Sequence, residues 1–131
     1  MNCSRACQLN KIHDACGVVG IFAKDQNKHI ARDVFHTLLS LQHRGQESAG
    51  IYTFAGGLLK GTRGMGLVDR VFSKHTLQGI FGNRGIGHVR YSTAGQSTID
   101  NAQPLLFKSP YLQFALAMNG TLTNFIQLKK H

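Results

Sequence analysis

Cysteine is the most reactive residue type in this sequence, and all three cysteines lie within the first sixteen residues. Cys3 and Cys7 are spaced C-x3-C, and no later cysteine completes a zinc or iron–sulfur set. An odd count at one end of the chain does not indicate a disulfide framework. Cys16 stands apart, because an apolar, β-branched stretch follows it directly. It is either a small buried residue at the start of a strand or a nucleophile.

The nucleophile hypothesis requires that residues 1–15 are removed, which would leave Cys16 with a free α-amino group. An α-amino group has a pKa of about 8 and a thiol one of about 8.5, so the proton passes between them at little cost. Residues 1–15 are polar and charged and lack the apolar region of a secretory signal. From this composition we expect a disordered leader.

Other chemistries find less support in the sequence. The 15 glycines form neither a phosphate-binding loop nor a nucleophile elbow. His29, His36 and His43 recur every seven residues, which separates neighbours by roughly 10 Å along a helix, too far to share one metal ion. Glu47 is the sole glutamate, so paired-carboxylate chemistry is poorly supplied.

Composition narrows the class of protein further. A chain of 131 residues suffices for one domain with one core. The net charge of +9 raises the possibility of nucleic-acid binding, but the basic residues are scattered, so we expect no nucleic-acid partner. No apolar run approaches the roughly 18 residues of a membrane span. The expectation is a cytoplasmic protein without a membrane partner.

The elements around Cys16 follow from the apolar pattern. Residues 16–23 predict a buried strand, and residues 30–42 predict a helix that ends at Gly45. Five further strands are predicted at 50–54, 57–61, 86–91, 105–107 and 114–117. Asn119 and Gly120 form a turn signal after the last strand, and Thr123 or Asn124 would cap a final helix from Phe125.

Five motifs of the chain resemble those of class II glutamine amidotransferases, which use an N-terminal cysteine. The stretch CGVVGI at 16–21 is similar to the mature start of these proteins. The others resemble one member, the amidophosphoribosyltransferase family: LQHRGQESAGI at 41–51, GHVRYSTAG at 87–95, NAQPLLF at 101–107 and NGTLTN at 119–124. Glucosamine-6-phosphate synthase fits less well, since RGYDSAG is expected where this chain has RGQESAG.

The resemblance implies an α+β fold, the αββα sandwich of N-terminal-nucleophile hydrolases, with two antiparallel sheets that this chain leaves incomplete. Residues 1–15 would be the propeptide, and residues 16–131 the N-terminal part of a class II glutamine amidotransferase domain. The phosphoribosyltransferase domain of the family would be absent from these residues. Met118 and Thr121 depart from the family's pattern, which usually has histidine and asparagine there.

The resemblance also implies roles for single residues. Cys16 would attack the side-chain amide of glutamine, with its own α-amino group as the base. The Asn119 side chain and the Gly120 N–H would form the oxyanion hole. Arg90, Thr93 and Arg44 would be the substrate-binding residues, with Arg90 on the α-carboxylate. Without the motif, Arg90 could equally be a solvated strand arginine and Asn119-Gly120 a plain hairpin turn.

The implied activity is glutamine hydrolysis that supplies ammonia to phosphoribosyl pyrophosphate, giving phosphoribosylamine in the first step of purine synthesis. No cofactor or metal is expected within these residues, whereas the full-length parent would use Mg²⁺ and an iron–sulfur cluster in some members. The parent would be a homo-oligomer. Two alternatives stay open: a catalytically inactive glutamine-binding remnant, and a basic nucleic-acid-binding module.

Overall fold

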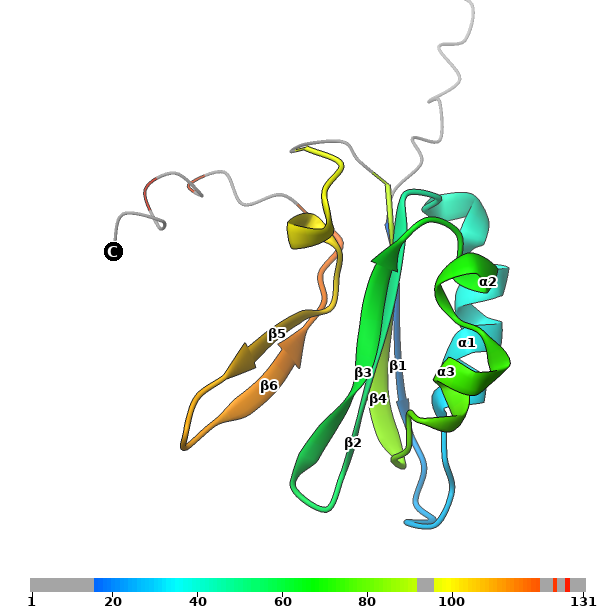
Figure 1. Ribbon diagram of the computed structural model, residues 1–131, viewed down its shortest axis with the longest axis vertical. Coiled ribbons are helices and arrows are strands. Elements are labelled where there is room, and N and C mark those ends of the chain that lie inside the picture. Colours follow the sequence, from blue (N-terminus) through cyan, green and yellow to red (C-terminus); the bar gives the residue numbers. More distant parts are fainter. Residues whose placement is uncertain (1–15, 92–95, 121–123, 125–126, 128–131) are drawn as a thin grey trace, which may run out of the picture.

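Two antiparallel sheets form the framework of the chain in a computed structural model (Figure 1). The structure describes residues 16–91, 96–120, 124 and 127. The larger sheet has the strand order β1-β4-β2-β3, and β5 and β6 form a separate hairpin. The strands are β1 (Gly17–Phe22), β2 (Ser48–Ala55), β3 (Leu58–Met65), β4 (Arg84–Arg90), β5 (Leu105–Lys108) and β6 (Gln113–Leu116).

Helices cover one face of the four-stranded sheet (Figure 1). They are α1 (Ala31–Ser40), α2 (Val68–Val71) and α3 (Lys74–Gln78), and the 3-10 turn η1 (Gln42–Arg44) follows α1. A second 3-10 turn, η2 (Ile99–Asn101), lies on the opposite side of the sheet and contacts β3 (Figure 1). Val34 and Leu38 of α1 are fully buried against the sheet. A Cβ on Gly87 of β4 would lie 2.6 Å from Val34 and 2.9 Å from Leu38. Glycine at that position therefore lets the helix approach the strand closely.

The other face of the sheet carries the β5–β6 hairpin at one edge. Strand β3 contacts β6, and the chain before β5 crosses this face (Figure 1). A cavity of about 510 Å³ lies between the sheet and β6. Its lining includes Phe22, Tyr52, Phe54, Ile86 and Phe114. None of the predicted site residues lines this cavity, so it is not the site of the predicted chemistry.

All six predicted strands are present, and most extend beyond their predicted limits. The predicted strand 57–61 runs from Leu58 to Met65, for example. Gly56 and Gly57 have φ values of 55° and 82°, the conformation of a two-residue hairpin turn between β2 and β3. The first helix is shorter than predicted: α1 ends at Ser40, and a 3-10 turn follows before Gly45.

The predicted fold class is confirmed as α+β with two antiparallel sheets. Of the four predicted layers, the described residues form one helical layer, the larger sheet and the hairpin. The sequence analysis missed α2, α3 and η2, which lie between predicted strands. The predicted propeptide at 1–15, the cap at Thr123 and most of the final helix from Phe125 lie outside the described residues.

Candidate functional site

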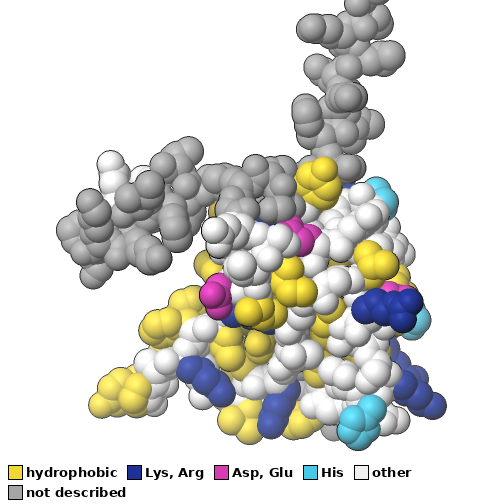
Figure 2. Space-filling model, turned by 45° about the horizontal axis from the view of Figure 1, so that its top comes forward, with side chains coloured by type: hydrophobic (Ala, Val, Ile, Leu, Met, Phe, Trp, Pro, Cys, Tyr) yellow, Lys and Arg dark blue, Asp and Glu magenta, His cyan; other side chains and the backbone are white. Residues whose placement is uncertain are grey.

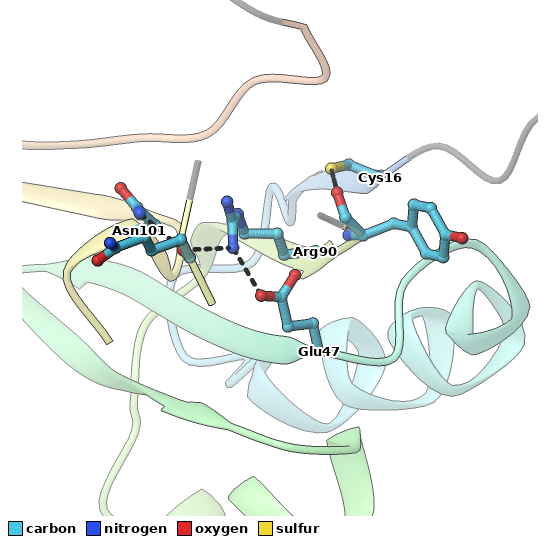
Figure 3. Close-up of polar contacts among 6 residues, drawn as sticks. Cys16, Glu47, Arg90 and Asn101 are labelled. Carbon is cyan, nitrogen blue, oxygen red and sulfur yellow. Dashed lines mark hydrogen bonds and ion pairs between the residues drawn. The ribbon is translucent and has the colours of Figure 1, made fainter. Parts of the chain in front are cut away.

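Cys16 directly precedes β1 and lies beside the end of β4 (Figure 3). Gly17 pairs with Val89, so the antiparallel register brings Cys16 next to Arg90 and Tyr91. The Tyr91 N–H donates to Cys16 Sγ at 3.5 Å, and the thiol donates to the Tyr91 carbonyl at 3.6 Å. The thiol is free and half-buried. Strand pairing thus places the predicted nucleophile at the edge of the core.

Arg90 is buried, with 6% of its surface exposed, so the alternative of a solvated strand arginine is wrong. Its Nη1 donates to Glu47 Oε1 at 3.0 Å and to the Gln96 carbonyl at 3.5 Å (Figure 3). Asn101 Nδ2 donates to the same carbonyl at 2.8 Å. These contacts hold the guanidinium at the same end of the sheet as Cys16. Glu47 Oε2 is buried and has no hydrogen-bond partner among the described residues.

Arg44 reaches this end of the sheet through the turn that follows α1. It is the last residue of η1, and its N–H donates to the Leu41 carbonyl at 2.8 Å. A Cβ on Gly45 would lie 2.6 Å from the Val89 carbonyl carbon. Only glycine lets the turn pack so closely on β4. Arg44 therefore lies near the Cys16 end of the sheet, and its role in the site stays a prediction.

Asn119 and Gly120 follow β6 in an exposed bend. Among the described residues, no hydrogen bond joins either of them to Cys16. The residue before them, Met118, is fixed: its N–H donates to Gln103 Oε1 at 2.8 Å, and its carbonyl is 3.2 Å from His88 Nε2. The structure thus ties the predicted oxyanion residues to the sheet through their neighbour. Thr93 lies outside the described residues.

The chain is similar to amidophosphoribosyltransferases over nearly its whole length. It is 46% identical to that of Methanothermobacter thermautotrophicus over 92% of this chain, and 44% identical to that of Synechococcus elongatus over 89%. A solved structure of the Bacillus subtilis glutamine phosphoribosylpyrophosphate amidotransferase matches with a TM-score of 0.74 and 42% identity, covering 86% of this chain and 24% of that one. No family model matches the sequence.

Over about nine-tenths of its length the chain matches amidophosphoribosyltransferases. It spans about a quarter of the length of these relatives, 26% of the Methanothermobacter protein and 23% of the Synechococcus protein. The resemblance on which the sequence analysis rested is therefore confirmed. The roles of Cys16, Arg90, Arg44, Thr93, Asn119 and Gly120 remain predictions.

The structure places three further residues near the predicted site of this amidophosphoribosyltransferase relative: Glu47 and Gln103, to which the sequence assigned no role, and His88, for which it favoured a structural role over catalysis. Glu47 holds Arg90, Gln103 holds Met118, and buried His88 contacts the same residue. Glu47 and Gln103 lie inside motifs that resemble the family, so those motifs were the available signal. No local pattern indicated their partners, which are 43 and 15 residues away.

His88 is neutral at pH 7. Burial lowers its pKa from 6.5 to about 4, although its hydrogen bond with the Met118 carbonyl acts in the opposite direction and the charge of Arg90 lowers it further. A carbonyl oxygen only accepts, so Nε2 carries the hydrogen of the neutral ring. His88 therefore serves as a fixed donor and carries no positive charge into the site.

Neither a metal-binding cluster of His, Cys, Asp and Glu nor a membrane-spanning helix is present in the part of the chain that the structure describes. No three of their His, Cys, Asp and Glu side chains come together in a way that would hold a metal ion. No helix in the described part of the chain is long and apolar enough to cross a membrane. The described residues thus offer no donor set for the Mg²⁺ or iron–sulfur cluster that the resemblance implies for the full-length parent.

Proposed function

We propose that Cys16 is the nucleophile of a glutamine-hydrolysing site, and that the chain supplies this part of an amidophosphoribosyltransferase. The observation that carries the proposal is the pairing of β1 with β4, which sets the Cys16 thiol beside the buried Arg90. The identity of 41% to 48% to amidophosphoribosyltransferases supports the same assignment. A thiol at a strand end next to a fixed guanidinium suits attack on a substrate that carries a carboxylate.

The proposed reaction begins when the Cys16 α-amino group accepts the thiol proton. Sγ then forms a bond to the side-chain amide carbon of glutamine, and the carbonyl oxygen becomes an oxyanion. The C–N bond breaks, the α-ammonium returns the proton to the leaving nitrogen, and ammonia departs. Water attacks the resulting γ-glutamyl thioester, which restores the thiol and releases glutamate. The base exists only if residues 1–15 have been removed.

Arg90 would bind the substrate α-carboxylate through its guanidinium. Its contacts with Glu47 and Gln96 fix the direction of the side chain before substrate arrives. A preoriented, planar guanidinium suits a planar carboxylate better than an ammonium does. Arg44 and Thr93 would support the same end of the substrate. Asn119 and Gly120 would donate to the oxyanion, a contribution of about 10²- to 10³-fold per donor.

The ammonia would serve the step that the names of the relatives describe, amination of phosphoribosyl pyrophosphate in purine biosynthesis. The chain matches about a quarter of those relatives, so this second step requires residues beyond the match. Glutamine hydrolysis is the part of the reaction that the described residues can support. The phosphoribosyl step is proposed for the whole protein alone.

The intact mass of the protein tests whether residues 1–15 are removed, and glutamate release tests whether the site hydrolyses glutamine. We expect loss of Met1 to Ala15 and glutamate release that Cys16→Ser lowers by at least about 10³-fold, since a hydroxyl is a far weaker nucleophile. Cys7→Ser is the matched control, because Cys7 would leave with the propeptide. Processed protein that binds glutamine without releasing glutamate would instead favour an inactive remnant. Salt-sensitive nucleic-acid binding would favour the basic module.

A further inference from the structure

Two side chains from different parts of the chain hold the backbone of Met118. Gln103 accepts from its N–H at 2.8 Å, and His88 donates to its carbonyl across 3.2 Å. Both backbone polar groups of one residue are thus bound by side chains, although Met118 belongs to no strand. We call these three residues the Met118 clamp. Asn119 and Gly120 follow the clamp directly.

His88 is a rigid member of the clamp. Its side chain is fully buried on β4, on the face of the sheet that carries the hairpin. Burial also keeps the ring neutral, so Nε2 donates to Met118 throughout the neutral pH range. His88 Nδ1 is buried without a hydrogen-bond partner among the described residues. The hydrogen bond that the structure shows for the ring is therefore the one to the Met118 carbonyl.

Gln103 is held on the same face by the sheet itself. A Cβ on Gly50 of β2 would lie 2.2 Å from the Gln103 carbonyl oxygen and 2.7 Å from Pro104. The neighbouring Ala102 carbonyl accepts from the Arg63 guanidinium of β3. The chain before β5 therefore lies directly on the backbone of β2, which fixes where the Gln103 side chain begins.

The clamp lies close to the nucleophile along the sheet. His88 pairs with Val18, two residues after Cys16 on β1. Cys16 is therefore roughly 7 Å along the strand from Val18, the residue opposite His88. Asn119 is one residue beyond Met118, a step of about 3.3 Å in an extended chain. In Figure 1, β6 points toward the end of the sheet where β1 begins. The residues after Met118 are thus directed at the Cys16 end.

We infer that His88 and Gln103 are positioning residues, which place the Asn119–Gly120 donors for the oxyanion by fixing the backbone of Met118. This inference rests on the proposed glutamine hydrolysis and deepens it. The clamp touches no reacting atom, so it acts on the transition state through the two donors. It should affect glutamine turnover much more than glutamine binding, which would depend on Arg90.

The test compares His88→Leu and His88→Gln in the protein that contains the whole chain, processed to Cys16. We expect His88→Leu to lower kcat for glutamate release by about 10²-fold, with KM changed less than about threefold, since one donor system is displaced. His88→Gln keeps an amide donor near Nε2 and should recover kcat to within about tenfold of wild type. His75→Gln, an exposed histidine on α3, is the matched control and should be neutral.

Two further measurements separate the clamp from the nucleophile. The rate at which iodoacetamide alkylates Cys16 should be the same in wild type and both His88 variants, because the reaction needs no oxyanion donors. The shape of the pH profile above pH 5 should also persist in His88→Gln; a shifted limb would make His88 an acid–base group and overturn the inference. Equal kcat in wild type and folded His88→Leu would overturn it as well.

Hydrogen exchange tests whether the Met118 clamp positions residues 118–120, even if wild type releases no glutamate. Absence of glutamate release would contradict the proposed function and not the clamp. The Met118 amide is bound by Gln103, so it should exchange slowly in wild type and faster in both Gln103→Leu and His88→Leu. Thermal unfolding confirms that each variant is folded. Exchange at residues 118–120 that stays unchanged in both variants would show that the two side chains do not position this segment.

Discussion

The four-stranded sheet and the β5–β6 hairpin are held together in different ways. Ile51 of β2 and Val89 of β4 are fully buried beneath α1, in a core that is continuous from strand to strand. The hairpin has no comparable core: all four residues of β5 are exposed, and Phe107 stacks on Phe114 at its surface. Figure 2 shows hydrophobic side chains on the lower left of the surface, where the hairpin lies.

The predicted site is divided between these two regions. Arg90 ends β4, and Cys16 and Glu47 directly precede β1 and β2, so the large sheet positions all three. Asn119 and Gly120 follow the hairpin, and their place depends on a few bonds from side chains to backbone. The difference teaches that the residues predicted as nucleophile and carboxylate ligand are positioned by the large sheet, whereas the predicted oxyanion donors depend on local contacts.

Breaking the ion pair of Arg90 should be the largest single perturbation of the large sheet. Glu47→Leu leaves a buried guanidinium without its carboxylate, and the free energy of unfolding should fall by about 3–5 kcal/mol. Lys28→Met removes the exposed pair between Lys28 and Asp33 and should cost less than about 1 kcal/mol. Urea unfolding of both variants measures this contrast, and equal losses would contradict the burial of the site.

The two regions can be compared directly by truncating one apolar side chain in each. Ile51→Ala opens a cavity in the core and should lower the free energy of unfolding by about 2–5 kcal/mol. Leu105→Ala on the hairpin removes a side chain that is 43% exposed, and we expect a loss below about 1 kcal/mol. A similar loss in both variants would mean that the hairpin is covered in the whole protein.

His88 joins the two regions, and its ionisation gives that link a pH dependence. Its folded pKa of about 4 lies below the unfolded value of 6.5, so the unfolded chain binds the proton first as pH falls. The contribution of neutral His88 to the free energy of unfolding is complete above pH 6.5 and is lost as the pH falls toward 4, by roughly 3 kcal/mol in total. His88→Gln should lack this part of the decline. Parallel stability curves for the two proteins between pH 6.5 and 4 would contradict it.

Adding a single methyl group where the chain before β5 packs on β2 should lower the stability of the fold. Gly50→Ala puts a Cβ into the Gln103 carbonyl and should cost about 1–3 kcal/mol, because the backbone must move. Gly20→Ala is the matched control on β1, where a Cβ would meet nothing within 4 Å. Thermal unfolding compares the two variants. If Gly50→Ala is as stable as Gly20→Ala, the contact with the sheet is looser than described.

Local pattern was enough to predict the strands and the first helix, but not the short helices. Apolar residues recur every two residues in the strands and every 3.6 in the helix, because one face of each element is buried. Helices α2 and α3 have four and five residues, too few to show a period. Ser73 caps α3 by accepting from the Thr76 N–H, which is a local signal that the sequence analysis did not use.

The sequence by itself determined the family, the strand pattern and which residue types are available for chemistry, because motifs and periods are local properties of the chain. Only the tertiary structure decided which of them meet. Cys16 contacts Tyr91 across 75 residues, Glu47 pairs with Arg90 across 43, and His88 reaches Met118 across 30. Such contacts follow from strand register and from the packing of the hairpin's flanks on the sheet. The buried partner of a charged or polar group is therefore set by the folded backbone and not by its sequence neighbours.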